Sequence, residues 1–139
     1  MRILQATPDG GKDSPVRAYF LFEIKGLCSV ALLRFNSGSR DNFHSHAFNA
    51  WTWFLGGSMY EERVYRGQGI KRRNYKFSLK PKFTSRHNLH RVVARCKSWC
   101  FTIRGPWSKT WTELTPDQNT LITLTHGRKI VKTEKYRGR

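Results

Sequence analysis

The chain has 139 residues, of which 38% are hydrophobic and 14% aromatic, so it is long enough for one domain with its own buried core. No apolar run approaches the ~20 residues of a membrane-spanning helix. Residues 1–5 lead into a polar Pro/Gly stretch rather than into a signal-peptide core, so we expect no membrane contact and a cytoplasmic location. The three cysteines show no CxxC spacing, which argues against a disulfide framework or a zinc ribbon.

The net charge of +17 is concentrated in the second half of the chain. Residues 1–69 hold 8 basic and 6 acidic side chains, whereas residues 70–139 hold 18 basic and 3 acidic ones. This asymmetry predicts a polyanionic partner, either nucleic acid or an acidic protein surface. The alternative is a solvated basic face that only keeps the protein soluble. No RRM, KH or helix-turn-helix signature indicates sequence-specific recognition.

Short apolar runs separated by turn residues follow one another along the chain, without helical periodicity. Turns every ~8–12 residues are typical of an all-β sandwich or barrel. Residues 1–139 are expected to form one domain, with a loop at about 6–16 and a basic C-terminal extension at about 115–139. The expected strands span 16–24, 27–35, 43–55, 59–65, 70–79, 89–94, 99–104, 110–114, 120–125 and 129–136, with a basic loop at 80–88.

The most informative local pattern is His44-Ser45-His46. On a strand, residues i and i+2 point to the same face, about 7 Å apart, and both imidazoles can reach one divalent ion at roughly 2.0–2.2 Å. A third ligand must come from another strand, and His90 at the start of an apolar run is the best candidate. His87 is a weaker alternative, because in an extended chain it points the other way. Surface histidines on a half-buried strand are the competing interpretation.

The spacing of Gly38, His44-Ser45-His46 and Gly57 resembles the first motif of the cupin superfamily, and Pro81 with His87 and His90 loosely resembles the second. Across about residues 17–112, several short stretches and the order in which they follow one another resemble a group of small cupin-like proteins of bacteriophages and bacteria. This resemblance implies a cupin-type jelly-roll barrel, a divalent metal ion (Fe, Mn, Zn or Ni) and a phage-encoded protein of the host cytoplasm or the virion. The stretches are His44-Ser45-His46, Trp53-Phe54-Leu55-Gly56-Gly57, Tyr60-Glu61-Glu62, His90-Arg91-Val92 and Trp99 through Trp111.

The chain departs from the cupin pattern at the glutamate ligand, whose position falls on Ala50 or Trp51. Water, His87 or Glu62 from the next strand are alternatives for the missing ligand, and weakened or lost metal binding is another outcome. Glu62 is the candidate catalytic base, or a carboxylate that supports a metal ligand, with Asp41 behind it. For both carboxylates, an ordinary surface or structural role is the alternative.

Three neutral imidazoles leave an ion with a 2+ charge and open positions. Such an ion binds anionic substrates, lowers the pKa of bound water or, as Fe(II), activates dioxygen. Arg104 and Lys109 flank Gly105-Pro106 and are candidate cations for a substrate phosphate, with a surface role as the alternative. The five tryptophans are expected mostly in the core, with a stacking platform at the barrel mouth as the alternative.

Two functions therefore remain open from the sequence. The first is a metal-dependent enzyme acting on a small polar or anionic substrate. The second is a non-catalytic phage structural or accessory component, in which the basic half contacts nucleic acid or an acidic protein surface within a homo-oligomer or larger viral assembly.

Overall fold

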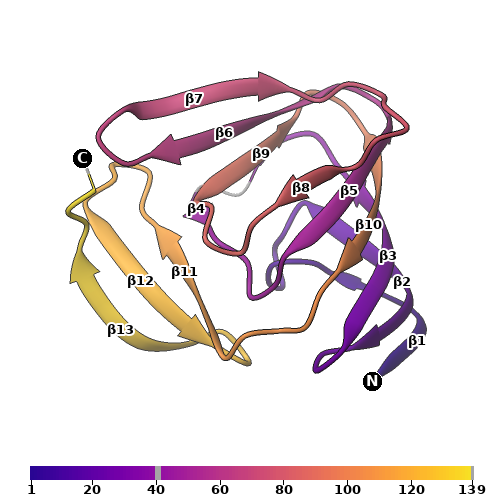
Figure 1. Ribbon diagram of the computed structural model, residues 1–139, viewed down its shortest axis with the longest axis horizontal. Helices are drawn as coiled ribbons and strands as arrows, with labels where there is room; N and C mark the ends of the chain where they lie inside the picture. The colour runs from indigo at the N-terminus through magenta and orange to yellow at the C-terminus, as the bar shows by residue number, and fades with distance from the viewer. Residues whose placement is uncertain (40–41, 139) are drawn as a thin grey trace.

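The computed structural model describes residues 1–39 and 42–138, which form thirteen β-strands and no helix within these ranges. The strands make two antiparallel sheets that surround a common interior (Figure 1). The expected all-β jelly-roll barrel is confirmed. No segment of the described ranges forms a helix that would be long and apolar enough to cross a membrane.

The six-stranded sheet has the order β1-β2-β3-β10-β5-β8 and forms one wall of the barrel. Its strands alternate between the interior and the surface, as a sheet with one covered face requires. In β10, for example, Cys100, Thr102 and Arg104 are buried while the residues between them are partly exposed. The strands are β1 (Arg2–Pro8), β2 (Val16–Ile24), β3 (Cys28–Phe35), β10 (Ser98–Arg104), β5 (Ala50–Gly56) and β8 (Lys82–Thr84).

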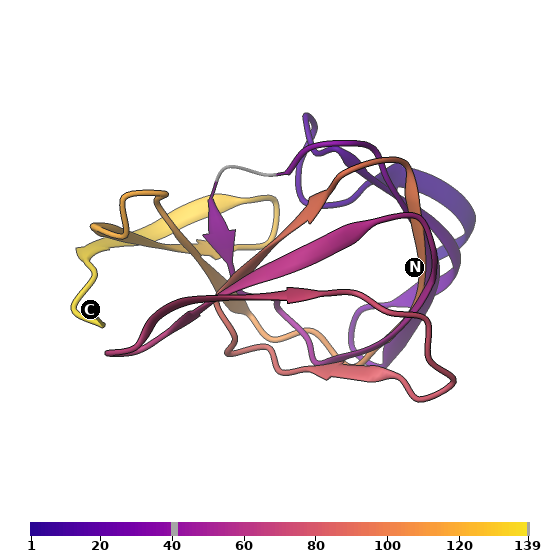
Figure 2. The ribbon, with the colours of Figure 1, turned by 90° about the horizontal axis from the view of Figure 1, so that it is seen from above.

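The seven-stranded sheet has the order β13-β12-β11-β4-β9-β6-β7 and forms the opposite wall. Its outer strands and the β6–β7 hairpin extend away from the six-stranded sheet (Figure 2). The strands are β13 (Lys129–Lys135), β12 (Thr120–Thr125), β11 (Thr110–Leu114), β4 (Phe43–His44), β9 (His90–Ala94), β6 (Met59–Tyr65) and β7 (Gly69–Asn74).

The inner face of the six-stranded sheet is apolar at one end of the strands and polar at the other. At one end, side chains of β2, β3, β10 and β5 form the hydrophobic core with residues from the opposite wall. At the other end, the register aligns Glu23, Ser29 and Arg104 in one row of buried polar side chains. Such a polar row at the end of a core indicates a site rather than packing. The core residues are Ala18, Phe20, Ala31, Leu33, Phe54, Met59, Ala94 and Cys100.

Several expected element boundaries were wrong. Residues 6–8 belong to β1, an edge strand where Pro8 is tolerated because its missing N–H removes no ladder bond within the sheet. β8 lies inside the expected 80–88 loop and pairs with β5. The expected strand 43–55 divides into β4 and β5, and the strand expected over 70–79 ends at Asn74.

The basic C-terminal segment is part of the sheet. β12 and β13 form a hairpin that continues from β11, and Gly67 N donates a hydrogen bond to Gly138 O (2.9 Å). The cysteines Cys28, Cys96 and Cys100 are all free thiols, as their spacing predicts.

Candidate metal centre

His44, His46 and His90 come together on the inner side of the seven-stranded sheet. His44 ends β4 and is paired directly with His90, the first residue of β9. The ring centroids are 5.0 Å apart in each of the three pairs. One ring nitrogen from each histidine lies within 4.8 Å of the others. Residues distant in sequence therefore present three imidazole donors to one point.

The donor distances fit a shared ion. Nε2 of His46 lies 2.9 Å from Nε2 of His90. Two nitrogens that each bind one ion at about 2.1 Å lie about 3 Å apart when their bonds to it meet at nearly a right angle. Imidazole is a good ligand for Zn, Fe and Ni. The chemistry and spacing of these donors thus suit a divalent transition metal.

Backbone contacts explain why both histidines of the His-Ser-His stretch turn inward although β4 ends at His44. Ser45 N donates to Thr112 O (2.8 Å), and Thr112 N donates to Ser45 Oγ (2.9 Å). These bonds fix the chain to β11 immediately before His46. Phe48 then stacks on the His46 ring, with centroids 5.2 Å apart, and holds it from the other side.

A carboxylate supports the cluster from the next strand. Oε1 of Glu61 on β6 lies 2.6 Å from Nδ1 of His90, and both side chains are buried. Nδ1–H of His90 donating to Glu61 leaves the Nε2 lone pair directed at the other histidines. This carboxylate therefore orients one donor of the candidate site.

Lys82 on β8 contacts the other oxygen of Glu61 and lies 3.5 Å from the Tyr75 hydroxyl. Burial raises the pKa of Glu61, but the hydrogen bond and charge of His90, together with Lys82, outweigh it and lower the pKa from 4.5 to about 2. Burial and the Glu61 charge raise the pKa of Tyr75 well above 10.0. Glu61 is accordingly ionised and Tyr75 neutral at physiological pH.

The structure corrects the placement of Glu62. Neighbouring residues of a strand point to opposite faces, so the Glu62 carboxylate lies with Arg91 (3.2 Å) and Arg72 (3.7 Å) instead of beside the histidines. Glu61, and not Glu62, is the carboxylate that lies beside the histidines. The sequence could have indicated that Glu61 points inward. It stands two residues after the apolar Met59 on the same strand face, and Met59 is fully buried.

His87 does not join the cluster formed by the other three histidines. It is exposed, and its Nε2 accepts a hydrogen bond from Arg86 Nε (3.3 Å). Asp41, considered as a carboxylate behind Glu62, lies outside the described residues. Lys82 was missed because it stands in the segment 80–88 that was expected to be a basic loop, and Tyr75 was expected within a strand over 70–79, whereas the strand ends at Asn74.

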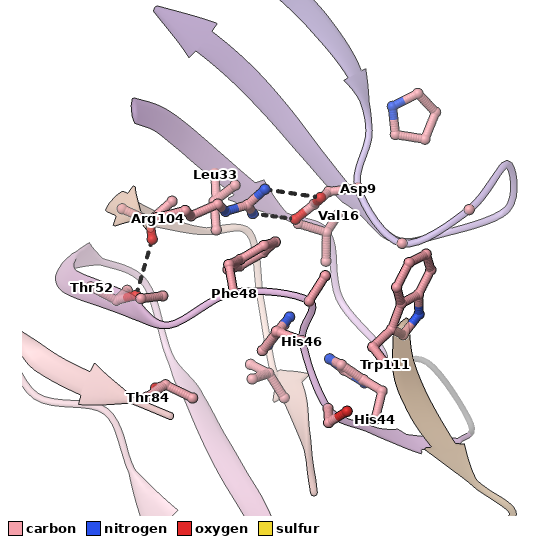
Figure 3. A pocket seen from close by; sticks show the side chains of 18 of the residues that line it. Asp9, Val16, Leu33, His44, His46, Phe48, Thr52, Thr84, Arg104 and Trp111 are labelled. Atoms are coloured by element: carbon pink, nitrogen blue, oxygen red, sulfur yellow. Dashed lines mark hydrogen bonds and ion pairs between the residues drawn. The ribbon is translucent and has the colours of Figure 1, made fainter. Parts of the chain in front are cut away.

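The histidines line a cavity of about 310 Å³ that reaches the polar row of the six-stranded sheet. Figure 3 shows His44 and His46 on one side of this cavity and Arg104, paired with Asp9, across Phe48 from them. Lys109, the other cation considered for substrate binding, is exposed and is not part of the cavity wall.

The expectation that most tryptophans lie in the core was wrong. Trp51 is exposed, and the other four are only partly buried. Trp107 and Trp111 line the cavity, where their rings meet edge to face with centroids 6.0 Å apart. They therefore supply an apolar wall to the candidate site.

The fold and this histidine cluster define the class: the chain has the cupin-type jelly-roll fold. No family model matches the sequence, and no curated protein sequence matches it. Among solved structures, an acetylacetone dioxygenase from Acinetobacter johnsonii is similar at a TM-score of 0.54 and 17% identity, covering 94% of this chain and 79% of that chain.

Two further solved structures agree on the fold. A sugar phosphate isomerase of the cupin superfamily from Silicibacter pomeroyi matches at a TM-score of 0.51 and 14% identity, over 89% of this chain and 78% of that chain. KdgF from Halomonas sp. matches at a TM-score of 0.53 and 12% identity, over 73% of this chain and 87% of that chain. Identities this low establish the architecture, so the function is argued from the site itself.

Proposed function

We propose that this chain binds one divalent transition metal ion (Fe, Mn, Zn or Ni) through His44, His46 and His90. We further propose that it is an enzyme acting on a small polar or anionic molecule that enters the cavity. The convergence of the three imidazoles in the wall of a cavity of about 310 Å³ is the observation that carries this proposal.

The bound ion would supply Lewis acidity or redox chemistry at its open positions. The chain's own residues have separate tasks. Glu61 fixes the orientation of His90, and Phe48 holds His46 in place. Trp107 and Trp111 give the cavity an apolar wall, which limits water beside the site.

The solved structures of similar fold give additional support. One is described as an acetylacetone dioxygenase, and another as an FeII form of HppE with a TM-score of 0.54 and 11% identity. This architecture therefore accommodates iron and oxygenation chemistry in other proteins.

Metal analysis tests the proposal. We expect about one divalent ion per chain in the purified protein, and loss of the ion in His44→Ala and His90→Ala. The matched control is His87→Ala, because this exposed histidine lies outside the cluster. Equal metal content in the wild type and both cluster variants would overturn the proposed metal site.

A second candidate function rests on the basic surface. β7 and β13 are the two edge strands of the seven-stranded sheet, and both are largely exposed. The Gly67–Gly138 hydrogen bond brings the turn of the β6–β7 hairpin to the end of the C-terminal strand. The basic surface comprises the exposed side chains on both faces of these two strands, including Lys71, Arg72, Arg73, Lys129, Lys132 and Lys135.

We propose that this surface contacts a polyanion, foremost nucleic acid, as it would in a phage structural or accessory component. The logarithm of the binding constant for a nucleic acid duplex should fall linearly with the logarithm of salt concentration. Replacing Lys71 and Arg73 by Gln should reduce that slope by about 2. Absence of salt-dependent binding would end this second proposal without affecting the metal site.

A further inference from the structure

Arg104 places a buried cation in the same cavity as the histidines. It ends β10, is only 3% exposed and lines the cavity. Its guanidinium lies 4.7 Å from the centroid of Phe48, and the Phe48 ring in turn stacks on the His46 ring at 5.2 Å. A single aromatic ring thus separates the guanidinium from the candidate metal centre (Figure 3).

The partner of Arg104 is a carboxylate in a geometry that a ligand would also adopt. Nη1 and Nη2 of Arg104 donate to Oδ1 (3.3 Å) and Oδ2 (2.6 Å) of Asp9. This two-bond pairing is how arginine binds free carboxylates. The Asp9 side chain is 30% exposed, whereas the guanidinium beneath it is almost fully covered.

The Asp9 carboxylate can leave without unfolding the loop that carries it. Asp9 N donates to Val16 O (2.9 Å), and Ser14 Oγ donates to Asp9 O. These bonds hold the backbone on both sides of the β1–β2 loop. Rotation of this partly exposed side chain would therefore free the guanidinium fork.

The charge balance of the cavity favours an incoming anion. Among the described residues lining it, Arg2, Lys25, Arg104 and Arg128 are cationic, and Asp9 and Glu23 carry carboxylates. Arg2 pairs with Glu23 (3.5 Å) and Arg128 with Glu113 (2.6 Å), so Arg104 and Lys25 are the lining cations that would attract a ligand once Asp9 withdraws. Buried charge must be compensated, so withdrawal of Asp9 requires another anion at Arg104. The apolar wall of Phe48, Trp107 and Trp111 suits a planar carbon body behind that anion.

We propose that Arg104 is the anion-binding residue of this cavity and that Asp9 is its built-in competitor. The ligand is a small organic acid with a planar apolar body, whose carboxylate replaces that of Asp9 on the guanidinium. As the substrate class of the metal centre, this ligand rests on the proposed function, but its binding to Arg104 does not require the metal.

The test compares benzoate with the neutral isostere benzamide in the metal-free protein, by calorimetric titration. We expect Asp9→Asn to bind benzoate about tenfold or more tightly than the wild type, because a charge-assisted competitor is removed. Arg104→Gln should lose benzoate binding, and benzamide should be insensitive to both changes. A purely structural Asp9–Arg104 pair predicts that Asp9→Asn lowers stability without a gain in benzoate affinity.

Two controls keep the outcome decisive. Arg104→Lys keeps the positive charge and the aliphatic stem, so it serves if Arg104→Gln does not fold, and it should still bind benzoate at least about tenfold more weakly than the arginine. Lys109→Gln removes the exposed cation on the same connection and should change nothing.

Benzoate affinity that is equal in the wild type, Asp9→Asn and Arg104→Lys, or absent from all of them, overturns the proposal. Metal content is measured separately on the same variants as purified, before the metal is removed for the titrations. A protein that binds benzoate through Arg104 but no metal would contradict the proposed metal centre alone.

Discussion

At the scale of single residues, the candidate centre depends on which of two adjacent carboxylates faces the interior. Glu61 is buried against His90, whereas Glu62 pairs with Arg72 and Arg91. Glu61 and Glu62 are a matched pair for mutagenesis, because the two side chains have the same chemistry and point in opposite directions.

Replacing Glu61 by Gln should weaken metal affinity about 10- to 100-fold, because His90 loses the carboxylate that orients it. The same change at Glu62 should leave metal affinity unchanged. Competition with a chromogenic chelator measures both constants. A larger effect from Glu62→Gln than from Glu61→Gln would contradict the assignment.

The thiols offer a second test at this scale. Burial raises the pKa of Cys100 from 9.0 to about 12, with Lys82 offsetting only part of the effect. The folded thiol therefore stays protonated at pH 8, and the fold loses stability as the pH rises from 9 towards 12, because the unfolded chain releases this proton first.

Iodoacetamide at pH 8 should accordingly alkylate the exposed Cys96 readily and Cys100 only after denaturation. Peptide mass spectrometry separates the two sites. Equal labelling rates in the native protein would show that Cys100 is accessible and would contradict its placement in the core.

At the scale of elements, the β5–β6 turn places Gly57 against β10. Gly57 has φ +104°, and a Cβ at this position would lie 2.6 Å from the Ser98 backbone Cα. Ser98 cannot retreat easily, because its Oγ accepts a hydrogen bond from Ser58 N (3.0 Å) and donates one to Cys96 O (2.9 Å). Both the dihedral angle and the space therefore require glycine.

Gly57→Ala should lower the free energy of unfolding by about 3 kcal/mol or more. The matched control is Gly67→Ala, which also has a positive φ but open space around the added Cβ, and should lose only about 1–2 kcal/mol. Urea unfolding measures both. Equal losses would mean that the turn relaxes away from Ser98.

The alternation of apolar residues was sufficient to predict most strands, including β2 (Val16–Ile24), β6 (Met59–Tyr65) and β12 (Thr120–Thr125) at their observed bounds. It could not predict β1 and β8, because both lie at sheet edges and carry residues typical of loops. Edge strands need little apolar alternation, since long-range pairing rather than burial holds them. The spacing of the histidines was sufficient to predict that they come together. Predicting that Glu61 points inward also required knowing which residues of its strand face the interior.

At the scale of the whole molecule, the proposed ion would stabilise the fold by mass action. An ion at a concentration 100 times its dissociation constant contributes about 2.7 kcal/mol to the free energy of unfolding. For a chain of this size, that corresponds to a rise in Tm of about 5–10 °C. The rise should be absent from His44→Ala, and scanning calorimetry with and without chelator measures it. A metal-dependent rise that persists in His44→Ala would place the bound ion elsewhere.

The Arg104–Asp9 ion pair could not be predicted from the sequence alone. The two residues are far apart in the chain, and neither spacing nor composition indicates that the β1–β2 loop folds over the end of β10. Arg104 was suggested as a substrate-binding cation, but its buried position and its competitor follow only from the tertiary structure.

The short strand β4 makes only one direct pairing with β9, and that pairing is between His44 and His90. Because β9 is also aligned with β6 over five residue pairs, the less constrained strand is β4, and a slip of β4 by one residue would turn His44 away from His90 and from the cavity. A bound ion would then stabilise the correctly aligned chains and not the incorrectly aligned ones. Refolding with metal present should therefore yield a more homogeneous product than refolding without it.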